Sequence, residues 1–190
     1  MTIASVLLYP GAGSDRDHSS LLAIEHRLGR RAHVDRIDFP YRREGRRAPD
    51  RAPKLMASMR NDLTTVARRR GPVVLGGRSM GGRMASMIAA DVDEGGPVVR
   101  LAGLVLISYP LHPPGKPDSL RVEHFPSIDV PCLFISGTRD PFGTSDEFAR
   151  WTPTVGGPVE QVWVEGGRHD VRGADEFIAD HVARFVGGLG

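Results

Sequence analysis

Residues 72–90 read PVVLGGRSMGGRMASMIAA, a serine between pairs of glycines with regular structure expected on both sides. The apolar, β-branched segment 72–76 precedes Gly77-Arg78-Ser79-Met80-Gly81, and the helix-forming segment 82–90 follows it. A serine on a sharp strand-to-helix turn needs small neighbours, because its backbone is strained and lies against the strand behind it. The pattern has weak specificity alone, so the flanking segments carry the interpretation. They predict a strand, a tight turn that exposes the Ser79 hydroxyl, and a helix.

Length and composition bound the kind of protein. At 190 residues, the chain is expected to form one domain over 1–190. It contains no run of 18 apolar residues, which excludes a membrane-spanning helix and a membrane partner. Segment 1–9 lacks the basic start of a signal peptide and predicts a first strand instead. The single cysteine, Cys132, excludes an internal disulfide and favours a cytoplasmic location.

The basic residues are nearly all arginines, since Lys54 and Lys116 are the only lysines and the net charge is +2. Arginine favours bidentate contacts with carboxylate or phosphate, which would suit an acidic substrate or a nucleic acid. Codon bias in the source genome explains the same excess, and we favour that explanation. A nucleic-acid partner is therefore not expected.

Strand and helix patterns alternate along the chain, which is typical of a parallel sheet with helices on both faces, a three-layer α/β/α sandwich. The expected strands are 3–9, 34–39, 73–76, 101–107, 131–136 and 159–164. The expected helices are 19–29, 52–70, 82–91, 145–151 and 174–187. Polar residues interrupt the second and sixth strands, which indicates sheet edges, whereas the other four are nearly continuous apolar runs. We therefore expect the strand order 2-1-3-4-5-6.

This order predicts where a ligand would bind. The chain reverses direction between strands 1 and 3, and open α/β sheets bind ligands beyond the carboxyl ends of strands at such a point. The loop after strand 1, Pro10-Gly11-Ala12-Gly13-Ser14, would then lie beside the serine turn after strand 3. The proline-rich connection 108–130 is too short for a lid domain, so we expect an open site without a cap.

A serine hydroxyl is a weak nucleophile and needs a base, which a third group must orient. Asp140 follows the fifth strand by a few residues, and His169 follows the sixth. The chain order Ser79, Asp140, His169 is the one required when these groups sit on such a sheet. Backbone N–H groups of Met80 and of Ala12 or Gly13 could stabilise the oxyanion formed on attack.

Two further segments are expected to crowd the site, 39–47 after strand 2 and 108–117 after strand 4. With Arg78 they could surround the nucleophile with positive charge and favour an anionic acyl substrate. Surface solvation explains these arginines equally well. The candidate substrate-binding residues are Gly13, Tyr41, Arg78, Tyr109 and His112.

Each assignment has a structural alternative. Ser79 could be only the tight turn of a doubly wound protein, Asp140 a turn residue before Pro141, and His169 an exposed loop histidine. Asp170 is a rival to Asp140 as the group that orients His169. No histidines and carboxylates have metal-ligand spacing, and the loop 11–13 lacks a full nucleotide-binding pattern, so neither a metal nor a cofactor is expected.

The blocks at 39–42 (FPYR), 75–84 (LGGRSMGGRM), 107–117 (ISYPLHPPGKP), 137–143 (GTRDPFG) and 167–170 (GRHD) resemble the α/β-hydrolase superfamily. They are most similar to a small, cap-less group named after a testis-expressed protein and a histone-acetyltransferase complex subunit, near the dienelactone hydrolases. The resemblance implies a minimal hydrolase fold without its first two strands. It also implies Ser79 as nucleophile, Asp140 as acid, His169 as base, and Ala12 with Met80 as oxyanion donors.

Two positions differ from these relatives. The group often has His-Gly-Ala-Gly-Gly where this chain has Pro10 to Ser14, and dienelactone hydrolases have a cysteine at the position of Ser79. We therefore expect a serine hydrolase that cleaves a small carboxylic ester or thioester through an acyl-enzyme. The alternative is a catalytically silent module that binds a protein or nucleic acid, as some eukaryotic relatives act as complex subunits.

Overall fold

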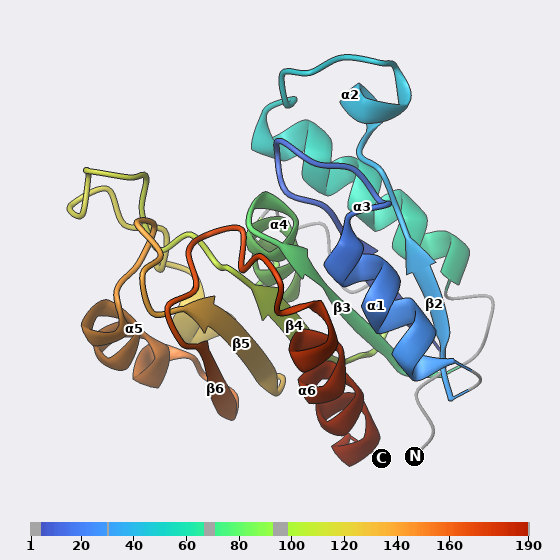
Figure 1. Cartoon of the computed structure of the whole chain (residues 1–190). Helices are drawn as coiled ribbons and strands as arrows, with labels where there is room; N and C mark the ends of the chain where they lie inside the picture. The colour runs from blue at the N-terminus through green and yellow to red at the C-terminus, as the bar shows by residue number, and fades with distance from the viewer. Residues whose placement is uncertain (1–4, 30, 67–70, 93–98, 190) are drawn as a thin grey trace.

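The computed structural model describes residues 5–29, 31–66, 71–92 and 99–189, which form a parallel sheet between two layers of helices (Figure 1). Every strand pair in the sheet is parallel, and the order is β2-β1-β3-β4-β5-β6, as the sequence predicted. The strands are β1 (Ser5–Tyr9), β2 (His33–Arg36), β3 (Val73–Arg78), β4 (Leu101–Ile107), β5 (Cys132–Gly137) and β6 (Val159–Val164).

The α-helices follow the strands, as crossover connections between parallel strands require. They are α1 (Ser19–Leu28), α2 (Pro40–Arg43), α3 (Ala52–Val66), α4 (Met80–Ala89), α5 (Ser145–Trp151) and α6 (Asp175–Gly188). Two short 3₁₀ helices, η2 (Phe125–Ser127) and η3 (Thr152–Thr154), lie in the connections on either side of β5 and α5.

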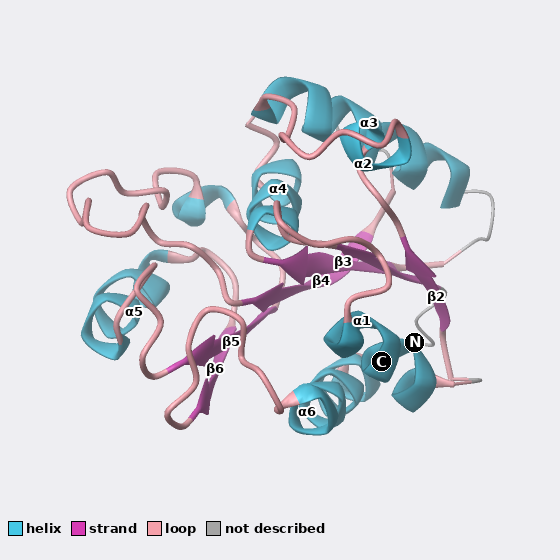
Figure 2. Cartoon of the chain, turned by 45° about the horizontal axis from the view of Figure 1, so that its top comes forward, coloured by secondary structure: helices cyan, strands magenta, loops and turns pink. Residues whose placement is uncertain are grey.

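Helices α3 and α4 cover one face of the sheet and α1 and α6 the other (Figure 2). An apolar cluster lies between each pair of helices and the sheet. Because successive strand residues point to opposite faces, Leu7 and Leu75 pack toward α3 and α4, whereas Val6 and Val74 pack toward α1 and α6. Phe134 on β5 is fully buried on the first of these faces. Burial of each such side chain contributes about 1.5–3 kcal/mol, so the two clusters together hold the sheet in place.

The edge strands are those with broken hydrophobic patterns, as expected. No residue of β2 is buried and only Val162 of β6 is, whereas β1, β3 and β5 are buried along their whole length. A strand with helices on both faces and neighbours on both sides meets no water, and this explains its apolar sequence. Strand β2 ends three residues earlier than predicted: the Ile37 amide still donates to the Leu8 carbonyl, and residues 38–39 lead into α2.

Several helix boundaries differ from the predictions. Helix α4 begins at Met80, two residues early, because the serine turn leads straight into it. The predicted helix 52–70 is described to Val66, and its last four residues lie outside the described part, as do residues 3–4 of the first predicted strand. Helix α2 was not predicted; it is a single turn with Pro40 at its first position, where the missing N–H has no cost.

The connection between β4 and β5, residues 108–131, contains η2 and no α-helix, and the structure describes all of it. The fold therefore has no helical cap between these strands, in agreement with the expectation. Within the described residues, none of the helices is long and apolar enough to cross a bilayer.

Candidate active site

Ser79 lies on a strained turn between β3 and α4. It has a φ of +46°, in the left-handed region that side chains other than glycine rarely adopt. The turn presses against β1: a Cβ at Gly77 would lie 2.1 Å from the Tyr9 carbonyl oxygen, and one at Gly81 would lie 2.4 Å from it. Only glycine fits at these two positions, which explains the glycines around the serine. The Ser79 side chain consequently projects beyond the carboxyl end of the sheet.

The three side chains expected to react lie in one hydrogen-bonded chain. The Ser79 Oγ is 2.8 Å from His169 Nε2, and His169 Nδ1 is 2.8 Å from Asp140 Oδ2 and 3.0 Å from Asp140 Oδ1. An ionised carboxylate only accepts hydrogen bonds, so the Nδ1 nitrogen carries the imidazole proton. The Nε2 nitrogen is then free to accept the Ser79 hydroxyl proton. The structure thus brings together residues from the ends of β3, β5 and β6.

Asp140 and His169 are both held in place by neighbours. Asp140 is 3 % exposed, and its Oδ1 accepts a hydrogen bond of 2.8 Å from the Phe142 amide. The Phe142 ring stacks on the imidazole of His169, with 3.9 Å between the ring centroids and 25° between the planes. The rival Asp170 is exposed, and it is Asp140 that contacts Nδ1.

The loop after β1 lies against the serine turn, as the strand order predicted. A Cβ at Gly11 would lie 3.5 Å from the Ser79 Cβ, and the Tyr41 hydroxyl donates a hydrogen bond of 3.0 Å to the Ala12 carbonyl. Within the described residues, the amides of Ala12 and Met80 donate to no protein acceptor. Met80 also begins α4, whose N-terminus carries partial positive charge. Both amides are available to an oxyanion.

Arg78 binds protein groups instead of facing outward to a ligand. It is 6 % exposed, and its Nη2 donates to the carbonyl oxygens of His169 (3.2 Å) and Asp170 (3.1 Å). Its Nη1 donates to His18 Nε2 at 2.5 Å. Burial lowers the pKa of His18, and the charge of Arg78 lowers it further, so His18 stays neutral and can accept. Arg78 therefore anchors the loop that carries His169.

Three other candidate substrate-binding residues, Tyr41, Tyr109 and His112, are buried and outside the lining of the cavity at Ser79. Tyr109 is fully buried, and its hydroxyl donates a hydrogen bond of 2.8 Å to the Arg121 carbonyl. Burial raises the pKa of both tyrosines, so each keeps its hydroxyl proton as a donor. These residues affect the site only through the segments that they hold.

A cavity of about 1050 Å³ opens over Ser79 and His169, and Gly13 lies in its lining. Five of its lining side chains are arginines, against one carboxylate, Asp170. The arginines are Arg78, Arg83, Arg121, Arg139 and Arg168, and the rest of the lining comprises Gly11, Ala12, Ser14, His18, Met80, Pro110, Pro141 and Phe142 besides those already named.

Of the positive charge that the sequence predicted around Ser79, only Arg78 lines the cavity. The segment 39–47 contributes none of the lining, because Arg46 forms ion pairs with Glu44 and Asp50. Sequence reasoning missed Arg83 and Arg121 as lining residues. A signal existed for Arg83: it follows Ser79 by four residues, one helical turn, and so lies on the same face of α4.

The family model for the alpha/beta hydrolase domain matches residues 2–180. The chain belongs to the α/β-hydrolase family.

Solved structures share the fold of this α/β-hydrolase at low sequence identity. A structure reported with the metagenome-derived lipolytic enzymes LipS and LipT has a TM-score of 0.76 and 16% identity, covering 98% of this chain and 94% of that one. Est1E from Butyrivibrio proteoclasticus has a TM-score of 0.76 and 12% identity, covering 99% and 88%. The RedJ thioesterase of Streptomyces coelicolor has a TM-score of 0.70 and 18% identity, covering 95% and 89%. These similarities establish the fold.

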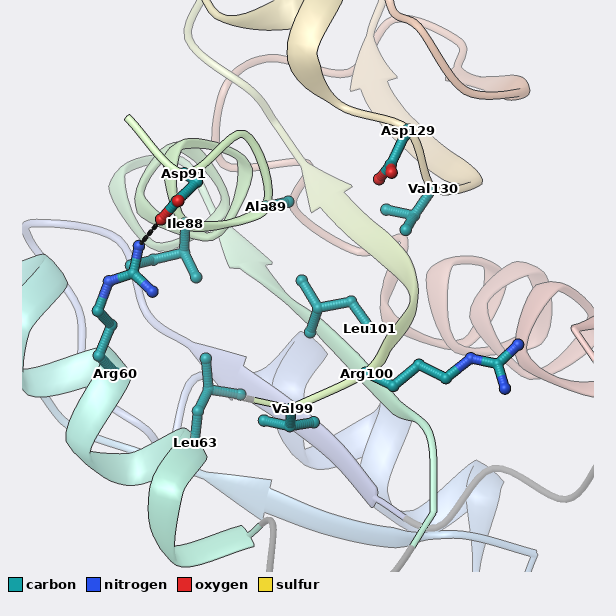
Figure 3. A pocket seen from close by; sticks show the side chains of 10 residues that line it. All are labelled: Arg60, Leu63, Ile88, Ala89, Asp91, Val99, Arg100, Leu101, Asp129 and Val130. Atoms are coloured by element: carbon teal, nitrogen blue, oxygen red, sulfur yellow. Dashed lines mark hydrogen bonds and ion pairs between the residues drawn. The ribbon is translucent and has the colours of Figure 1, made fainter. Parts of the chain in front are cut away.

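The α/β-hydrolase has a second cavity, of about 410 Å³, at the amino ends of the strands (Figure 3). It lies between α3, the end of α4 and the start of β4, where Arg60 Nη2 contacts Asp91 Oδ1 at 2.5 Å. Because the strands are parallel, this cavity lies at the opposite end of the strands from Ser79. In the part of the chain that the structure describes, no three His, Cys, Asp or Glu side chains are placed to hold a metal ion.

Proposed function

We propose that this chain is a serine hydrolase that cleaves a carboxylic ester or thioester through an acyl-enzyme. The hydrogen-bonded chain from Ser79 through His169 to Asp140 carries the proposal, because it joins a nucleophile, a base and an orienting carboxylate at their required distances. Membership of the α/β-hydrolase family supports hydrolysis as the reaction class.

The tautomer of His169 leaves Nε2 free to accept a proton during acylation. As the Ser79 Oγ attacks the carbonyl carbon of the substrate, the C–O bond forms and the carbonyl π electrons move to oxygen. His169 Nε2 takes the hydroxyl proton, and Asp140 stabilises the imidazolium through Nδ1–H. When the intermediate collapses, the bond to the leaving oxygen or sulfur breaks and Nε2 returns its proton to that atom.

Deacylation repeats the same steps with water. His169 removes a proton from water, the resulting hydroxide attacks the acyl carbon, and the proton returns to Ser79 Oγ as the carboxylic acid leaves. The amides of Ala12 and Met80 stabilise the oxyanion in both steps. One such donor contributes about 3 kcal/mol to the transition state.

The substrate class is supported by the structural neighbours. These include a structure reported with two lipolytic enzymes and a thioesterase. A cavity of about 1050 Å³ would hold a small-molecule ester. We also propose membership of the small cap-less group that the sequence resembles. A cytoplasmic location is proposed from the single cysteine, Cys132, whose thiol pKa burial raises to about 12, so that it stays protonated.

A fluorophosphonate probe tests this proposal, because it labels only an activated serine. We expect the wild type to be labelled and Ser79→Ala to lose all labelling. Ser145→Ala, which changes an exposed serine at the start of α5, should be labelled like the wild type. With an aryl acetate, Ser79→Ala and His169→Gln should each lower kcat about 10⁴–10⁶-fold.

Absence of labelling in the wild type, or equal labelling of Ser79→Ala, would contradict the proposal. Either outcome would favour the alternative, a catalytically silent module that binds a protein or nucleic acid. Nucleic-acid binding would then appear as an affinity that falls steeply between 50 and 200 mM salt, by about 10³-fold or more for several phosphate contacts.

A further inference from the structure

Two arginines from different segments line the cavity beside the candidate nucleophile. Arg83 lies one helical turn along α4 from Ser79, and its amide donates to the Ser79 carbonyl at 2.9 Å. Arg121 lies in the connection after β4, where its amide donates to the Leu111 carbonyl and its own carbonyl accepts from Tyr109 Oη, both at 2.8 Å. Both backbones are therefore fixed, and both side chains reach the same cavity.

Among the residues that the structure describes, neither guanidinium has an anionic partner. In the part of the chain that the structure describes, Arg83 and Arg121 form no ion pair, and the Arg83 Nε is buried without an acceptor. Other arginines of this chain are paired: Arg36, for example, contacts both Asp17 and Glu25. A half-buried cation without an anionic partner lowers the stability of the folded state. Two such arginines in one cavity therefore require an explanation.

The two cations also act on each other and on their surroundings. Burial lowers the pKa of Arg121, and the charge of Arg83 lowers it further. Burial and the charge of Arg83 likewise lower the pKa of His124 to about 4. Positive charge thus accumulates on this side of the cavity, and the charge of Glu123 offsets it only in part at His124. An anion bound between the two guanidinium groups would remove that repulsion.

The remaining arginines of the cavity differ in this respect. Arg78 is committed to the backbone of the His169 loop, and Arg139 and Arg168 are exposed to solvent, which screens their charges. Arg83 and Arg121 alone among the five combine partial burial with the lack of a partner in the described residues. Guanidinium groups bind carboxylates in a bidentate manner, which gives affinity and orientation together.

We propose that Arg83 and Arg121 form a subsite for a carboxylate on the substrate, so that the enzyme cleaves esters that carry a negative charge besides the scissile bond. This inference rests on the proposed serine hydrolase function. The carboxylate lies on either the acyl group or the leaving group, and the subsite selects charged over neutral esters of equal size.

Two pairs of matched substrates test the subsite. Mono-4-nitrophenyl glutarate and 4-nitrophenyl pentanoate differ in charge on the acyl group, and 4-acetoxybenzoate and 4-acetoxybenzamide differ in charge on the leaving group. We expect kcat/KM above the uncatalysed rate to favour the anion about tenfold or more in one of the pairs. Arg83→Gln and Arg121→Gln should each reduce this preference about tenfold, and Arg83→Lys should restore part of it.

Arg47→Gln is the matched control, because Arg47 is exposed and lies outside the cavity lining. It removes the same net charge and should leave the preference for the anion unchanged. An effect of Arg47→Gln equal to that of Arg83→Gln would indicate only the overall field of the protein and would overturn the subsite. Equal rates for charged and neutral esters in both pairs would overturn it as well.

Direct binding separates this inference from the proposed function. Calorimetric titration with glutarate requires no turnover, and we expect Arg83→Gln and Arg121→Gln to weaken binding about tenfold relative to Arg47→Gln. If no ester is cleaved and Ser79 is not labelled, the hydrolase proposal fails, and the titration alone decides on the subsite. The subsite is overturned if glutarate does not bind, or binds equally to all variants, and no kinetic preference for the anionic ester is found.

Discussion

Two residues, Asp140 in the loop after β5 and Asp170 directly after His169, are candidates for the carboxylate that orients the histidine. The geometry distinguishes them, because Asp140 is buried and contacts Nδ1, whereas Asp170 is exposed. A buried carboxylate acts in a low dielectric and holds one imidazole tautomer. In the mechanism proposed above, the orientation of His169 therefore depends on Asp140.

We expect Asp140→Asn to lower kcat for an aryl acetate about 10³–10⁴-fold, because an amide at this position favours the wrong tautomer of His169. Asp170→Asn is the matched control and should change kcat less than about threefold, since exposed charges have small effects. Steady-state kinetics of the two purified variants measures both. A larger loss in Asp170→Asn than in Asp140→Asn would show that Asp170, and not Asp140, orients His169.

The Arg78 side chain connects two elements of the site, the end of β3 and the loop after β6. Arg78 is the last residue of β3, and it donates to two carbonyl oxygens of the loop that follows β6. The strands β3 and β6 lie apart in the sheet, with β4 and β5 between them. Ser79 and His169 are thus positioned relative to one another by Arg78 in addition to their own strands.

Arg78→Met should therefore lower kcat about 10–100-fold, since a displacement of about 1 Å at a reacting group has effects of this size. KM should change less than about threefold, because Arg78 makes its contacts to protein groups. Arg78→Lys should restore part of kcat, as an ammonium can still donate to one carbonyl. Thermal unfolding of each variant checks that it is folded; a change in KM alone would indicate that Arg78 binds substrate directly.

The molecule as a whole should lose stability in mild acid through a half-buried histidine, His124. His124 joins the connection 108–131 to α4, with its Nε2 at 2.8 Å from Ser86 Oγ. Burial lowers its pKa to about 4 in the folded protein, against about 6.5 in the unfolded chain. Between these values the unfolded state binds the proton more strongly, so stability falls as pH decreases from about 6.5 toward 4.

At pH 5 this linkage amounts to about 2 kcal/mol of unfolding free energy relative to pH 7.5. Urea unfolding at the two pH values measures it. His124→Gln removes the titrating group and should reduce the difference between the two pH values by about that amount. His26→Gln, at an exposed position of α1, should leave the difference unchanged. An identical pH dependence in His124→Gln and the wild type would contradict the assignment.

Most of the fold was predictable because burial on both faces leaves a strong mark on sequence. The apolar runs at β1, β3, β4 and β5 and the interrupted patterns at β2 and β6 predicted the strand order, which is confirmed. Prediction failed where structure is short and held by tertiary contacts, as at α2 and η2. On α6, apolar character does not mean burial at every position: Phe177 is 42% exposed and lies against His181.

The sequence by itself determined the sheet, the serine turn and the carboxyl edge at which Ser79, Asp140 and His169 would meet, because periodicity and glycine spacing are local properties. Their catalytic roles stay predictions. Only the tertiary structure decided the tasks of the arginines: Arg78 anchors a loop, whereas Arg83 and Arg121 enter the cavity unpaired. A long flexible side chain can reach any of several partners, and its partner is set by segments distant in the chain.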